Sequence, residues 1–138
     1  MARLIESSLW VDFTRKKSPV ALKAFIQPWI LDPEACLCEL IAFEVLRHTT
    51  PQERTQIEAQ FATLPVLTTP AKLWRDATRL GQICRDKGHT AGSLDLLIAT
   101  LAIHHGAELI TFDADYEPIA LHSDLNLRLL TRPGLNPS

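Results

Sequence analysis

A short apolar segment near the C-terminus, residues 109–111, runs directly into the acids Asp113 and Asp115. The segment predicts a buried strand, and the long apolar stretch 94–103 predicts a buried helix whose first turn carries Asp95. Acids at the C-terminal end of a strand and the N-terminal end of a helix can share one pocket. In open α/β sheets that edge binds ligands. The pattern therefore favours an α/β fold with an acidic pocket.

Strand-like and helix-like segments alternate along the chain. The expected strands cover residues 3–5, 35–38, 66–68, 109–111 and 127–130, and the expected helices cover residues 9–13, 20–26, 39–48, 52–62, 70–87 and 94–105. Ser7 or Ser8 is expected to cap the N-terminus of the first helix, and Ser93 that of the last helix. Gly88 is expected to end the longest helix, at residues 70–87. The alternation predicts a three-layer α/β/α sandwich around a mostly parallel sheet of about four to five strands. We expect a single domain over residues 1–138.

Composition excludes several classes of protein. Apolar residues make up 46% of the chain and charged residues 22%, which is typical of globular proteins and argues against disorder. The formal charge of −2 provides no overall positive field, so any nucleic-acid binding must be local or metal-assisted. Three cysteines form no disulfide framework, and we expect a cytoplasmic protein without a signal peptide or membrane span.

Two more acids lie in apolar surroundings. Glu44 lies in an apolar helical segment where few positions face water, and Glu6 follows the first expected strand. Each acid also has an ordinary explanation. Glu44 could pair with Arg47, Asp95 could complement the helix dipole, and acids after a strand are common in turns. Four such positions at one sheet edge are harder to explain separately, because clustered carboxylates repel unless a cation lies between them. Carboxylates favour magnesium or manganese over zinc.

Four segments carry a family resemblance: LIESSLWVD at 4–12, ELIAFEVLR at 39–47, KGHT at 87–90 with SLDLLIA at 93–99, and LITFDADY at 109–116. In this order they resemble the acidic motifs of the PIN-domain ribonucleases, most closely the VapC-type toxins of prokaryotic toxin–antitoxin pairs. The resemblance runs from residue 4 to about residue 130.

The resemblance implies an α/β/α sandwich and metal-dependent endonucleolytic cleavage of RNA. It implies that Glu6, Glu44, Asp95 and Asp113 hold Mg²⁺ or Mn²⁺, with Asp115 as an auxiliary acid or a helix cap. It further implies a homodimer that is neutralised by a cognate antitoxin protein. The chain departs from the family pattern at Glu6, where Asp is usual, and at His48, which replaces a frequent Gly.

Two alternatives stay open at this point. A receiver-type signalling module also gathers acids at strand ends, but it normally adds a lysine after a late strand, and no lysine follows Lys87 here. A PIN-like fold that has lost catalysis could serve only as a binding scaffold. Aromatic residues on the expected helices, Trp10, Phe25, Trp29 and Trp74, suggest an interface with a partner, although core packing could also explain them.

Overall fold

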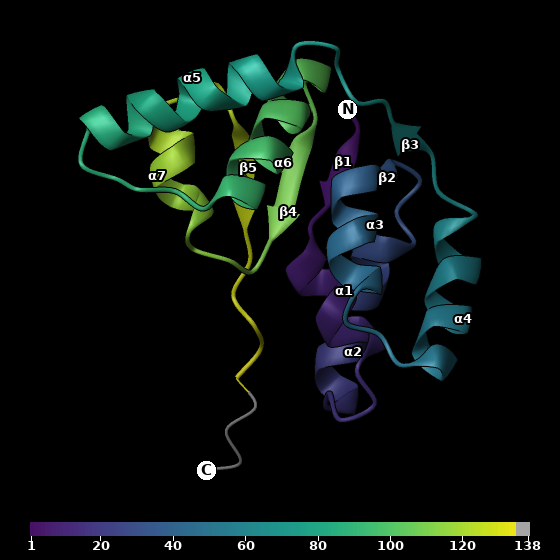
Figure 1. Cartoon of the computed structure of the whole chain (residues 1–138). Helices are drawn as coiled ribbons and strands as arrows, with labels where there is room; N and C mark the ends of the chain where they lie inside the picture. The colour runs from purple at the N-terminus through teal and green to yellow at the C-terminus, as the bar shows by residue number, and fades with distance from the viewer. Residues whose placement is uncertain (135–138) are drawn as a thin grey trace.

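The computed structural model describes residues 1–134, which form five strands and seven helices (Figure 1). The strands are β1 (Arg3–Ile5), β2 (Ala35–Cys38), β3 (Val66–Leu67), β4 (Glu108–Thr111) and β5 (Asn126–Leu129). The helices are α1 (Ser7–Thr14), α2 (Val20–Ile30), α3 (Glu39–Leu46), α4 (Pro51–Phe61), α5 (Leu73–Asp86), α6 (Ser93–His105) and α7 (Tyr116–Leu121). None of the helices among the described residues is both long and apolar enough to cross a membrane.

All neighbouring strands run parallel, in the order β3-β2-β1-β4-β5. The chain builds outward from β1 through β2 to β3, then returns to place β4 on the other side of β1. The strand order therefore reverses between β1 and β4, and such a reversal creates a crevice at the C-terminal ends of the strands. In the register, Ile5 lies beside Ile110, so the residues that follow these two strands emerge next to each other.

The helices form two groups (Figure 1). In the first group α1 packs against α2 and α3, and α3 packs against α4; in the second, α5, α6 and α7 pack against one another. Right-handed crossovers place helices on opposite faces of a sheet when the direction of travel reverses. The result is the predicted α/β/α sandwich, with a fully parallel sheet. Helices α3 and α6 meet across the two groups.

The apolar core lies on both faces of the sheet, between the sheet and the two groups of helices. Leu4, Ile5, Leu109 and Ile110 of the two central strands are fully buried, as the expected double coverage of the sheet requires. Cys36 and Cys38 are buried in β2, and burial raises the pKa of both thiols. These cysteines are therefore small residues of the apolar core.

Several helix ends differ from the prediction; for example, α5 begins at Leu73 and not at residue 70. Helix α2 passes through Pro28 and ends at Ile30. Pro28 has no N–H to donate to the carbonyl of Ala24, which belongs to an exposed residue. Glu6, not Ser7 or Ser8, is the N-cap of α1, and Gly92, not Ser93, is the N-cap of α6. Gly88 follows α5 with φ +90°, as predicted for the residue after a helix.

Candidate active site

Glu6 lies at the end of β1, at the point where the strand order reverses. Its backbone N–H donates to the carbonyl of Ile110 on β4, which continues the sheet by one residue. Its side chain is only 4% exposed, and the Oε1 atom accepts the backbone N–H of Ser8 at 3.0 Å, which caps α1. Burial raises the pKa of Glu6, and the charge of Glu44 acts in the same direction against the hydrogen bonds that stabilise the carboxylate.

Two hydroxyl groups connect Glu6 to the end of β4. Ser8 Oγ and Thr111 Oγ1 each donate to Glu6 Oε1 at 2.6 Å. Ser8 Oγ also accepts the backbone N–H of Phe112 at 3.0 Å, and Thr111 Oγ1 accepts that of Asp113 at 2.9 Å. Within residues 1–134, every hydrogen bond to the Glu6 carboxylate therefore reaches Oε1, and none of them occupies Oε2.

Three aspartates come together beside this network, and we refer to them as the aspartate cluster: Asp95, Asp113 and Asp115. Each offers a carboxylate oxygen, and these oxygens lie within 4.8 Å of one another. Asp113 Oδ1 accepts the backbone N–H of Asp115 at 2.9 Å, which holds the turn after β4. Asp95 lies in the first turn of α6. The cluster thus combines the strand end and the helix start expected from the sequence, and it also includes Asp115.

The electrostatic environment of Asp95 is unusual for an aspartate. Burial and the neighbouring charge of Asp113 raise the pKa of Asp95 to about 6, and Glu6 and Glu44 contribute in the same direction. Clustered carboxylates disfavour ionisation of one another unless a positive charge compensates them. The charges of Asp113, Glu6 and Glu44 therefore all act on Asp95. Among the described residues, however, the group of oxygens within 4.8 Å of one another contains Asp95, Asp113 and Asp115, and neither Glu6 nor Glu44.

Glu44 approaches from α3. Ser7 Oγ donates a hydrogen bond to Glu44 Oε1, which ties the first turn of α1 to α3. The alternative ion pair between Glu44 and Arg47 is not among those formed within residues 1–134. The Arg47 guanidinium instead lies over the Phe43 ring, 5.9 Å from its centre. Glu44 is therefore oriented by a hydroxyl and not by a cation.

Tyr116 is the residue of this region that the sequence did not indicate. Its side chain is fully buried at the start of α7, and its hydroxyl makes no hydrogen bond of normal geometry with any of residues 1–134. The hydroxyl lies near Asp95, and burial together with the charges of Glu6 and Asp95 raises the pKa of Tyr116. A buried polar atom without a partner is uncommon and marks a place where a further group can bind.

Ser7, Ser8 and Thr111 were also not identified as site residues. The pattern "acid, then two hydroxyl residues" was visible at positions 6–8, but the partners of the hydroxyls depend on contacts between distant segments. The only local signal for Tyr116 was its position directly after Asp115.

Comparison with known proteins identifies the family. A PIN domain family model matches residues 3–121, most of the chain. The chain belongs to the PIN-domain family. Ribonuclease VapC11 of Mycobacterium tuberculosis is 34% identical over 128 residues, which cover 88% of this chain and 94% of the relative. Ribonuclease VapC21 of the same species is 29% identical over 96 residues, which cover 68% of this chain and 70% of the relative.

Solved PIN-fold structures agree with the architecture. VapBC2 from Rickettsia felis, solved with a DNA fragment from its promoter, matches with a TM-score of 0.74 at 18% identity, over 94% of this chain and 99% of that chain. VapBC-1 from nontypeable Haemophilus influenzae matches with a TM-score of 0.71 at 18% identity, over 94% and 98% of the two chains. These likenesses confirm the fold.

The residues present fit a hard divalent cation. The aspartate cluster supplies oxygen atoms close enough to share one ion, and Tyr116 leaves a buried hydroxyl beside it without a partner. Oxygen donors are the ligands that magnesium and manganese prefer, whereas zinc sites use histidine and cysteine more often. The histidines and cysteines of the described chain form no such group with these acids.

Proposed function

We propose that this chain is a metal-dependent endoribonuclease, the toxin of a toxin–antitoxin pair, which hydrolyses RNA phosphodiester bonds. The observation that carries the proposal is the meeting of Asp95 with Asp113 at the reversal of the strand order, in a chain of the PIN-domain family. The names of the VapC relatives, which call those proteins ribonucleases, support the same activity.

We propose Glu6, Glu44, Asp95 and Asp113 as the residues that hold the cation, with Asp115 at the edge of the site, and magnesium or manganese as the ion. When bound, such an ion supplies the positive charge that offsets negative charge on the phosphate oxygens of the substrate. Ser8 and Thr111 hold Glu6 in one orientation, because the hydroxyl proton of each is donated to Oε1. Ser7 does the same for Glu44.

We also propose an antitoxin protein and a second copy of the chain as partners. The solved relatives named above are VapBC pairs, which supports a protein antitoxin. Of the aromatic residues expected at an interface, only Trp74 is strongly exposed, at 67%, while Trp10 is fully buried against Phe61. Phe43 on α3 is 60% exposed and adds to the apolar surface. Light scattering at micromolar concentration is expected to give twice the chain mass; a monomer at every concentration contradicts the dimer.

Cleavage of RNA tests the function directly. The purified protein is expected to cut structured RNA when Mg²⁺ or Mn²⁺ is present and to stop when a chelator is added. Asp113→Asn should abolish cutting while its circular dichroism spectrum stays that of the parent. A parent protein that binds the ion but leaves every RNA intact would support the alternative of an inactive scaffold.

A further inference from the structure

Two hollows lie side by side between the C-terminal end of α1, the start of α2 and helix α4. One has a volume of about 240 Å³ and the other about 660 Å³, and Thr14, Lys23 and Gln56 line both. We call the combined hollow the basic groove. It lies outside the acidic centre and contains none of the proposed metal ligands.

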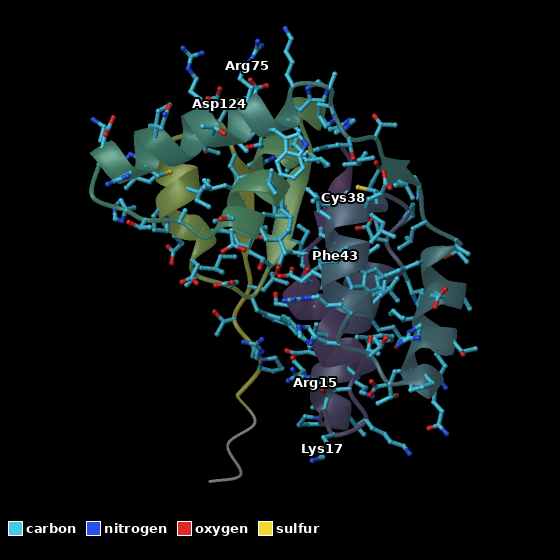
Figure 2. All side chains as sticks on the ribbon, in the orientation of Figure 1. Arg15, Lys17, Cys38, Phe43, Arg75 and Asp124 are labelled. Carbon is cyan, nitrogen blue, oxygen red and sulfur yellow. The ribbon has the colours of Figure 1, made fainter. Side chains whose placement is uncertain are left out.

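Four of the 14 basic residues of the chain gather at this groove. Arg15, Lys16, Lys17 and Lys23 all line it, and within residues 1–134 none of them forms an ion pair. Figure 2 shows Arg15 and Lys17 at the end of the molecule opposite to Arg75 and Asp124. The groove therefore presents a local positive field on a chain whose net charge is −2.

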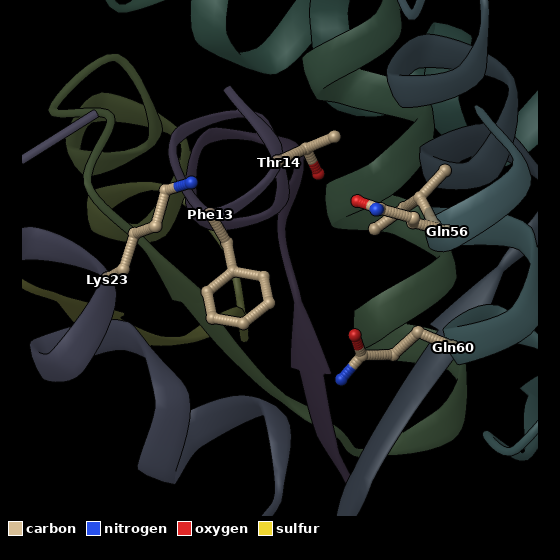
Figure 3. Close-up of a pocket in the computed structure, with 6 residues that line it drawn as sticks. Phe13, Thr14, Lys23, Gln56 and Gln60 are labelled. Carbon is tan, nitrogen blue, oxygen red and sulfur yellow. The ribbon is translucent and has the colours of Figure 1, made fainter. Parts of the chain in front are cut away.

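The wall formed by α4 is polar but nearly uncharged. Gln52, Gln56 and Gln60 repeat every four residues and so lie on one face of the helix. In the close-up of the smaller hollow, the amides of Gln56 and Gln60 lie across from Phe13 and Lys23 (Figure 3). The one acid that lines the groove is Glu53, whose carboxylate is already engaged in capping α4 through the N–H of Thr50.

Helix α1 links this groove to the acidic centre. Glu6 caps its start and Arg15 ends it, and eight helical residues span about 12 Å. Without an ion the acidic centre repels phosphates, so basic side chains near the centre but outside it favour the binding of an RNA strand.

We propose that the basic groove binds single-stranded RNA on one side of the cleaved bond, an inference that rests on the proposed ribonuclease function. Arg15, Lys16, Lys17 and Lys23 contact backbone phosphates, and the glutamine amides contact base edges or ribose hydroxyls. The half-buried ring of Phe13 offers a surface for a base to stack on. Cations combined with an aromatic ring and amides are typical of single-strand recognition and not of duplex recognition.

The test compares two variants that lose the same charge. Arg15→Gln, Lys16→Gln and Lys17→Gln are combined in a groove variant; Arg75→Gln, Arg79→Gln and Arg85→Gln, all exposed on α5, are combined in a control variant. The probe is a fluorescein-labelled oligouridine of about 12 nucleotides, and binding is followed by fluorescence anisotropy over a range of salt concentrations. A chelator is present so that no cleavage occurs.

The groove variant is expected to bind the oligonucleotide about tenfold more weakly than the parent at low salt. Because each phosphate contact to a single strand adds about 0.7 to the slope of log affinity against log salt, the loss of three contacts should flatten that slope by about 2. The control variant should bind within about twofold of the parent. Equal weakening of both variants, or no weakening of the groove variant, overturns the proposal.

Cleavage kinetics separate this inference from the function it rests on. With Mn²⁺, the groove variant should raise KM and leave kcat unchanged, since the metal ligands are intact. If the parent cuts RNA and the groove variant has the same KM as the parent, the groove does not bind the substrate, and the proposed ribonuclease activity is unaffected. If the parent never cuts RNA but the groove variant still loses oligonucleotide binding, the proposed ribonuclease activity is wrong and the RNA-binding groove is not.

Binding of a polyglutamate peptide tests a different occupant of the groove. A groove variant that keeps RNA binding but loses binding of this peptide assigns the groove to an acidic protein segment and also overturns the proposal.

Discussion

At the scale of single residues, Glu6 is the departure from the family pattern that bears most on the site. Its Oε1 atom is held by Ser8 and Thr111, and the longer side chain reaches back to cap its own helix. The carboxylate can therefore serve the fold through one oxygen and a cation through the other. We therefore expect that cation binding requires the negative charge of Glu6 and tolerates a change in the length of its side chain.

We expect Glu6→Gln to weaken manganese binding and RNA cleavage by at least about tenfold, because a neutral amide is a poorer ligand for a hard cation. Glu6→Asp should keep both activities within about tenfold, since the charge stays in place. The increase in melting temperature on adding Mn²⁺, measured for both variants beside the parent, checks this. If Glu6→Gln gains as much stability from Mn²⁺ as the parent, Glu6 is not a ligand.

Asp95 makes the stability of the metal-free protein depend on pH. Its pKa rises from an ordinary 3.8 to about 6 in the folded protein. The folded state therefore binds the proton more tightly, so this contribution to stability is fully present below about pH 4 and is lost as the pH rises to about 6. The loss is on the order of 1–3 kcal/mol.

Asp95→Asn should remove that contribution. Urea denaturation in chelator between about pH 4 and pH 7 should show the variant gaining stability relative to the parent as the pH rises. The difference between the two proteins isolates Asp95 from other titrating groups, such as Asp32, whose lowered pKa acts in the opposite sense. A constant difference across this range contradicts the assignment.

We expect the hydroxyl of Tyr116 to lower the stability of the metal-free protein. This buried hydroxyl lies near Asp95 but makes no hydrogen bond of normal geometry with any of residues 1–134, so Tyr116→Phe should raise the free energy of unfolding by about 1 kcal/mol in chelator. If the hydroxyl gains a partner when the ion binds, the stabilisation by Mn²⁺ should be smaller in the variant than in the parent. Thermal denaturation with and without Mn²⁺ measures both effects, and a destabilised variant in chelator disproves the first.

At the scale of elements, the ends of β1 and β4 behave as one unit. Thr111 bridges them, since its hydroxyl donates to Glu6 and accepts the N–H of Asp113. Thr111→Val keeps the shape of the side chain but removes both hydrogen bonds. We expect a loss of about 1–3 kcal/mol in unfolding free energy, together with weaker manganese binding.

Glu108 provides the control for this change. It lies at the other end of β4, where it accepts hydrogen bonds from Arg3 at 3.1 Å and from Arg128 at 2.9 Å. Glu108→Gln should also destabilise the protein, because two arginines lose a charged partner, yet manganese binding should stay unchanged. Equal effects of Thr111→Val and Glu108→Gln on manganese binding would mean that general stability, and not the bridge, controls the site.

Elements whose signal is local were predictable from the sequence, and elements that depend on packing were not. Strand β4 and helix α6 are apolar enough to be recognised by themselves. Helix α7 has only six residues and contains Pro118, and it is held by burial of Tyr116 and Ile119, which no local pattern reveals. Glu6, Glu44, Asp95 and Asp113 were also predictable as site candidates, because each lies within or next to an apolar segment of the sequence. The Ser7–Glu44 hydrogen bond joins residues 37 positions apart and depends on how α1 packs against α3.

At the scale of the whole molecule, the fold places opposite charges at the two ends of α1. The acidic centre lies where the strand order reverses, and the basic groove lies about one helix length away. In these two proposals, this separation lets a chain with a net charge of −2 hold RNA and a cation near each other. We propose that the acids that follow β1 and β4 and the acids on α3 and α6 form one cation site.

Calorimetric titration of Mn²⁺ tests that claim most directly. The parent is expected to bind the ion with measurable affinity, and the double variant Asp95→Asn with Asp113→Asn is expected to lose detectable binding. The double variant should remain folded, and in chelator it should be at least as stable as the parent, because two repelling charges are gone. A folded double variant that binds Mn²⁺ like the parent would contradict the account.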